Sequence, residues 1–125
     1  MTGPANSTLW AVIWPSAGLA VWAVHFAGIY AVHAHACERG LAARSLLGLP
    51  WAATLVVALT LLALAALAAL FVLARPVRTT FGDEEAEPDF TRWFGAAACV
   101  VAAFAVLFEA VPALVLPACW QTGNW

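Results

Sequence analysis

Three apolar runs, at about residues 9–36, 51–74 and 93–116, constrain this chain more than any other feature of its sequence. A hydrocarbon core of about 30 Å is crossed by about 20 apolar residues in helical form. Each run reaches that length, and the charged residues, 10% of the chain, lie almost entirely outside the runs. Because backbone groups in lipid must be satisfied internally, we expect an all-α membrane protein of three transmembrane helices.

The rest of the composition excludes other classes of protein. The hydrophobic fraction is 65%, whereas soluble domains are about half apolar. No basic segment precedes the first run, which is too long for a signal peptide, so we expect residues 1–125 to form a single mature domain. The net charge of −2 gives no reason to expect a nucleic-acid partner. Pro15 either starts the first spanning helix or kinks a longer one.

The loops give the orientation in the membrane. An acidic loop is expected at residues 76–92, on the same side as the N-terminus. That side carries three arginines and the other side carries two: Arg75, Arg78 and Arg92 against Arg39 and Arg44. Because positive charge is retained in the cytoplasm, we expect a cytoplasmic N-terminus. Cys37 and Cys119 then lie together on the outer side, where oxidising conditions permit a disulfide.

Cys37 and Cys119 admit three interpretations. The first is a disulfide between the ends of the first and third helices. The second is a pair of free thiols. The third is a copper site that adds His33, because sulfur and imidazole together suit Cu(I). The spacing matches no strong metal motif, so we expect the disulfide and no bound metal. Cys99, inside the third run, is expected to be an inert apolar residue.

The three histidines do not converge from one helix. At about 100° per residue, six residues of the first helix fall on one face within about 120°: Gly18, Trp22, His25, Ile29, His33 and Cys37. His35 points nearly the opposite way. Opposite axial positions of a haem therefore cannot both be filled by this helix. We expect no haem or other cofactor in this chain.

The third helix has a small face and a bulky face. The small face contains Gly95, Ala98, Ala102, Ala105, Glu109 and Ala113. The bulky face contains Val100, Phe104, Leu107, Val111 and Leu114. Small residues in register let membrane helices approach closely. We therefore expect the small face to pack inside the protein and the bulky face to meet lipid or a partner subunit.

His25 and Glu109 are predicted to pair across the first and third helices. Measured from Cys37, His25 lies about 18 Å deep, and measured from Cys119, Glu109 lies about 15 Å deep. An ionisable group in hydrocarbon pairs or becomes neutral, so we expect a hydrogen bond between the two side chains. Such a pair has three possible roles: it holds the two helices together, it relays protons, or one of its members faces a cofactor in a neighbouring subunit. A relay needs further titratable groups in line, and we identify none in the sequence.

Several segments together resemble a known group of proteins: WAVHFAGIYAV around His25, CERG at residues 37–40, Trp93 before the third helix, and FEAVPALVLPAC at residues 108–119. They are similar to small three-helix membrane proteins of proteobacteria that are associated with haem-copper cytochrome c oxidase gene clusters. The pattern does not include His33 or His35 and brings no catalytic residues.

The resemblance implies a multi-pass protein of the bacterial inner membrane. It implies a non-catalytic accessory subunit of a terminal oxidase, with larger membrane-protein subunits and lipids as partners. A membrane assembly factor for copper or haem insertion is the first alternative. A scaffold subunit of another membrane redox or photosynthetic complex is the second. A redox or quinone-binding protein that uses His25 and Glu109 is the third.

Overall fold

The computed structural model describes residues 4–74, 90–117 and 119. Three long helices account for most of them: α1 (Pro4–Glu38), α2 (Trp51–Ala74) and α3 (Phe90–Val115). Each contains a stretch that is long and apolar enough to span a membrane, with the stretch in α1 running from Val12 to Glu38. The prediction of an all-α fold with three candidate spans is therefore confirmed. Of the expected acidic loop, residues 76–89 lie outside the described part, and residues 90–92 belong to α3.

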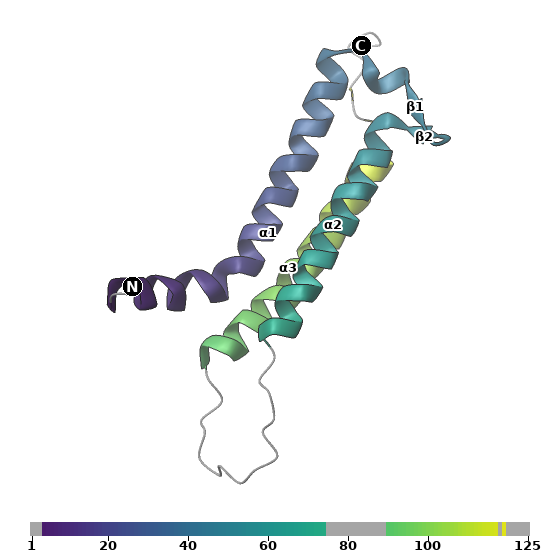
Figure 1. The fold of residues 1–125 in the computed structure, drawn as a ribbon. Coiled ribbons are helices and arrows are strands. Elements are labelled where there is room, and N and C mark those ends of the chain that lie inside the picture. The colour runs from purple at the N-terminus through teal and green to yellow at the C-terminus, as the bar shows by residue number, and fades with distance from the viewer. Residues whose placement is uncertain (1–3, 75–89, 118, 120–125) are drawn as a thin grey trace.

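Pro15 kinks a longer helix, which was one of the two expected alternatives. α1 begins at Pro4 and continues through Pro15 without a break in its assignment. Figure 1 shows the N-terminal part of α1 turning away from the line of the bundle. Proline causes such a turn because it lacks an N–H donor and its ring clashes with the preceding helical turn. The remainder of α1 runs beside α2 and α3.

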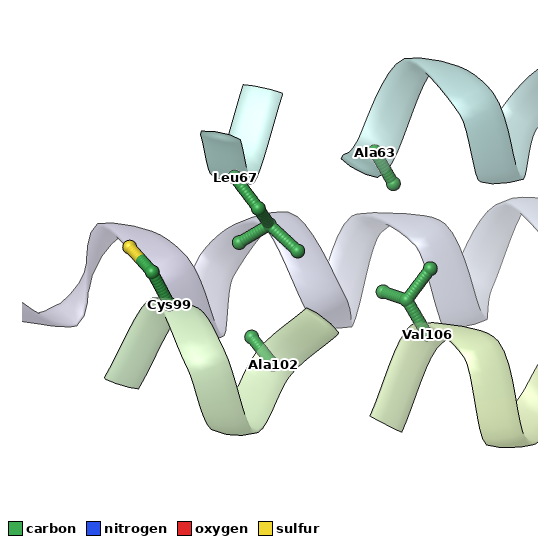
Figure 2. Packing of buried hydrophobic residues seen from close by; sticks show 5 residues of the cluster. All are labelled: Ala63, Leu67, Cys99, Ala102 and Val106. Atoms are coloured by element: carbon green, nitrogen blue, oxygen red, sulfur yellow. The ribbon is translucent and has the colours of Figure 1, made fainter. Parts of the chain in front are cut away.

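Each helix packs against both of the others. The central cluster contains Ala63 and Leu67 from α2 and Cys99, Ala102 and Val106 from α3. Figure 2 shows Leu67 and Ala63 directed toward the side chains of α3. Val21 and Trp22 of α1 pack against the same cluster. Most of these side chains are small, as expected where membrane helices pack without a hydrophobic drive between them.

Two glycines of α1 mark where the helices approach most closely. A Cβ atom added at Gly18 would lie 3.2 Å from the backbone Cα of Cys99. A Cβ atom added at Gly28 would lie 3.2 Å from a methyl group of Leu59 on α2. Both distances are tighter than ordinary van der Waals contact. The absence of a side chain at these positions therefore lets α1 lie close to both neighbours.

The buried face of α3 is rotated relative to the small face that the sequence predicts. Gly95, Ala98 and Ala102 are buried, but Ala105 and Ala113 are only half-buried. Three further buried residues complete this face: Cys99, Val106 and Ala110. The reason is that α3 contacts two helices, so its buried face is wider than one stripe of small residues. The expected bulky face is exposed along its length: Val100, Phe104, Leu107, Val111 and Leu114.

A short hairpin lies between α1 and α2, where the sequence indicates only a loop. After a turn of 3₁₀ helix (Leu41–Ala43), strands β1 (Ser45–Leu46) and β2 (Leu49–Pro50) pair antiparallel. The two residues between them, Leu47 and Gly48, have φ of 55° and 80°. Positive φ at both central positions is the requirement of a type I′ hairpin turn. The Thr54 hydroxyl donates to the carbonyl oxygen of Leu46 at 3.0 Å, which ties the hairpin to the start of α2.

Candidate functional site

Four polar side chains meet inside the bundle, and we call them the polar cluster: Trp22 and His25 from α1, Thr60 from α2 and Glu109 from α3. Trp22 and His25 are three residues apart, so they share one face of their helix. His25 is only 3% exposed. All four lie within candidate spans. Polar groups at such positions face the bundle interior and pair with one another.

The expected neighbours His25 and Glu109 are brought together, but the expected hydrogen bond is not formed. Nδ1 of His25 lies 3.6 Å from Oε2 of Glu109, which is an ion-pair distance. Hydrogen bonds between nitrogen and oxygen span about 2.7–3.2 Å. In the described part of the chain, neither atom has a hydrogen-bond partner. The prediction of a direct hydrogen bond is therefore wrong, although the contact agrees with the prediction that the two residues lie at similar depth.

Trp22 and Thr60 supply the hydrogen bonds that the pair lacks. The indole N–H of Trp22 donates to Oε1 of Glu109 at 2.8 Å. Nε2 of His25 lies 3.1 Å from the hydroxyl oxygen of Thr60. Sequence reasoning did not assign these two residues to the pair. The signals were present, because Trp22 shares the His25 face and Thr60 is one of two polar side chains in residues 51–74.

The Thr60 hydroxyl fixes the direction of the His25 hydrogen bond. It donates its single hydrogen to the carbonyl oxygen of Val56 at 2.7 Å, so its oxygen accepts from Nε2–H of His25. Nδ1 of His25 is then the ring nitrogen that faces Oε2 of Glu109.

A groove between α1 and α3 adjoins the polar cluster. Its volume is about 380 Å³. Four residues of α1 line it, together with three of α3 and the two residues that follow Val115: Phe26, Ile29, Tyr30 and His33; Glu109, Pro112 and Ala113; and Leu116 and Pro117. The side chain of Glu109 is 23% exposed. Nε2 of His33 is buried and has no hydrogen-bond partner in the described part of the chain.

A second cavity lies at the end of the bundle that carries the hairpin. Its volume is about 670 Å³, and its walls include Ala42, Pro50, Ala52 and Cys119. His33 lines both this cavity and the groove. A titratable side chain thus stands between the end of the bundle and Glu109. The sequence places His33 on the same helix face as His25, but it does not show that His33 lines both the groove and the second cavity.

Cys37 and Cys119 form a disulfide with a Cα–Cα distance of 5.3 Å, as the first interpretation of the sequence predicts. The bond joins the end of α1 to the segment after α3. It leaves no thiolate for the copper site that His33 would complete. Among the described residues, no group of three or more His, Cys, Asp or Glu side chains is placed to hold a metal ion. Cys99 is a free and buried thiol in the helical core.

No protein-family model matches the chain, and comparisons with curated proteins and with solved structures found no match. The polar cluster, the groove, the disulfide and the outer faces of the helices are therefore the observations on which a function is proposed.

Proposed function

We propose that the chain is a non-catalytic accessory subunit of a larger electron-transfer complex in the bacterial inner membrane. We further propose that this complex is a haem-copper terminal oxidase, as the sequence segments around His25 and Glu109 imply by resemblance. In this proposal the larger subunits carry the haem and the copper, and this chain packs against them. Lipids cover the faces that the larger subunits leave free.

The observation that carries the proposal is an exposed seam on α3. We call it the α3 strip, and it consists of Val101, Phe104, Phe108, Val111 and Val115, which are 61–82% exposed. Their spacing alternates between three and four residues. This spacing is the heptad pattern of helices that pair side by side, a geometry that is common in membrane bundles. The strip is therefore shaped to receive one further helix.

The outer face of α2 offers no comparable seam. Its exposed large side chains fall into two separate groups, one in its first half at Val57, Leu61 and Leu62 and one near its end at Val72 and Leu73. Between Leu64 and Leu70, the exposed positions are alanines. Lipid chains adapt to such a surface, whereas a partner helix has few large side chains there to pack against. This contrast supports α3 as the docking helix.

The first test is gentle solubilisation of the native membrane and purification through a tag on this chain. The proposal predicts oxidase subunits in a fixed ratio near one to one, measured by quantitative mass spectrometry. A transient assembly factor gives a ratio far below one. Purification with the subunits of another redox or photosynthetic complex supports the scaffold alternative and contradicts the oxidase assignment.

The second test compares two doubly substituted chains. Phe104→Ala with Phe108→Ala removes the two aromatic anchors of the α3 strip, and Leu61→Ala with Leu62→Ala makes a matched change on α2. Because aromatic anchors carry much of an interface's binding energy, the first variant is expected to lose about tenfold of its co-purified partner. The α2 variant is expected to retain it. Equal recovery from both variants contradicts docking through the α3 strip.

A further inference from the structure

The groove between α1 and α3 contains polar atoms that the fold itself leaves without partners. Oε2 of Glu109 and Nε2 of His33 are buried, and neither has a hydrogen-bond partner in the described part of the chain. A buried polar atom without a partner is destabilising because it has lost its hydrogen bonds to water. Both residues line the same groove. A ligand that donates a hydrogen to each of them therefore removes two such penalties.

The remaining wall of the groove is apolar and aromatic. Phe26 and Tyr30 are 54% and 73% exposed, so the groove is open to the surroundings of the bundle along α1. Ile29, Pro112 and Leu116 complete the lining with aliphatic surface. Pockets for small molecules combine such walls with a few placed polar groups, at volumes of about 300–1,000 Å³. The groove, at about 380 Å³, has room for one aromatic ring with substituents.

The spacing of the two polar groups favours a ring with a hydroxyl at each end. Oε2 of Glu109 lies beside His25, and His33 is two turns farther along α1, about 12 Å by helical rise. The oxygens of a para-quinol are about 5.5 Å apart, so with a hydrogen bond at each end the ligand spans about 11 Å. A simple phenol reaches only one of the two groups.

Depth favours a quinol over a phospholipid. Glu109 contacts His25, which lies 13 residues before the end of α1 at Glu38, about 20 Å by helical rise. A phospholipid keeps its polar head at the membrane surface, and its acyl chain has no hydrogen to donate. A quinol with an isoprenoid tail resides within the hydrocarbon layer, so one of its hydroxyls can reach the depth of Glu109.

We propose that the groove binds the ring of a para-quinol, with one hydroxyl donating to Glu109 and the other donating to His33. Small rotations of these two side chains turn Oε2 and Nε2 toward the ring. The isoprenoid tail passes across Phe26 and Tyr30 and extends into the lipid. The site holds the quinol and performs no step on it. This proposal goes beyond the subunit function and replaces the expectation that the chain binds no cofactor.

The test measures quinol retention by nanodiscs of phosphatidylcholine. Oxidised full-length chain in nanodiscs is equilibrated with decylubiquinol under argon, and empty nanodiscs correct for partition into lipid. The bound quinol is extracted and counted by chromatography. The proposal predicts a saturable excess of about one quinol per chain. No excess over empty nanodiscs overturns it.

Two comparisons show whether the hydroxyls and the named residues are responsible. The dimethyl ether of the same quinol keeps the ring and tail but has no hydrogen to donate, so it is expected to bind at least tenfold more weakly. His33→Phe keeps an aromatic ring without Nε2 and is expected to weaken quinol binding at least tenfold. The matched variant His35→Phe changes an exposed residue outside the groove and is expected to bind as the native chain does.

A third variant distinguishes a blocked groove from a misfolded chain. Ala113→Leu fills the groove without changing any member of the polar cluster, and it is expected to abolish the excess while the Cys37–Cys119 disulfide and the helical circular dichroism persist. Equal binding of quinol and ether, or equal binding by His33→Phe and His35→Phe, overturns the proposal. None of these results alters the co-purification experiments, so the subunit function and the quinol site fail independently.

Discussion

A single hydroxyl hydrogen on Thr60 determines how the polar cluster is arranged. Because that hydrogen goes to the Val56 carbonyl oxygen, His25 must donate from Nε2, and its Nδ1 faces Glu109. Helical rise alone predicts that His25 and Glu109 share a depth. It cannot predict the hydrogen bonds, because these depend on rotamers and on a third helix. The indole N–H of Trp22 and the hydroxyl of Thr60 therefore became visible only in the structure.

Thr60→Val tests this arrangement at the residue scale. Valine keeps the shape of threonine but leaves Nε2–H of His25 buried without an acceptor, so we expect a loss of about 1–2 kcal/mol in the free energy of unfolding. The measurement is unfolding of the purified chain by SDS in mixed micelles, followed by circular dichroism. Thr54→Val is the matched control, because the carbonyl oxygen released at Leu46 lies in an exposed hairpin and gains water. Equal losses from the two substitutions contradict the assigned role of Thr60.

At the scale of elements, the sequence predicted α2 to the residue and the other elements less closely. Residues 51–74 are mostly alanine, leucine and valine, follow Pro50 and end before Arg75-Pro76, so the limits of the helix are marked chemically. α1 begins earlier than expected because Pro15 bends the helix instead of starting it. The hairpin was missed because Leu47 occupies a positive-φ position, where asparagine or glycine is the usual signal.

The disulfide gives a prediction about how α1 and α3 are held together. The bond links residues 82 positions apart in the sequence. In the chain-entropy account, closing a loop of that size destabilises the unfolded chain by about 4.5 kcal/mol. We expect Cys37→Ser to lower the SDS concentration at which the helices separate, and reductant to have the same effect on the native chain. Cys99→Ala is the control, in which sensitivity to reductant persists. A native chain with identical midpoints before and after reduction disagrees with this role.

At the scale of the whole molecule, the bundle has two different ends. The disulfide, the hairpin and the larger cavity lie at one end, and the start of α3 at Phe90 lies at the other (Figure 1). From the arginine count, three against two, we expect the disulfide end on the outer side of the membrane. A disulfide is the state expected on a side that faces an oxidising compartment.

This orientation is tested by thiol labelling in intact spheroplasts. In a Cys99→Ala background, the disulfide leaves no native thiol to react. Leu47→Cys, at the exposed tip of the hairpin, is expected to react with a membrane-impermeant maleimide without lysis. Phe90→Cys, at the exposed start of α3, is expected to react only after lysis. The reverse pattern places the N-terminus outside and contradicts the assignment.

The turn in α1 makes its N-terminal segment project sideways from the line of the bundle at one end of the molecule (Figure 1). A straight helix that packs along this side of α1 meets the projecting segment. It must therefore end before that segment or tilt away from it. The outline of the protein in the plane of the membrane is therefore broader near one leaflet than near the other. A neighbouring protein therefore meets a different shape at each end of the molecule. This difference in shape can orient the two proteins relative to each other independently of the loop arginines.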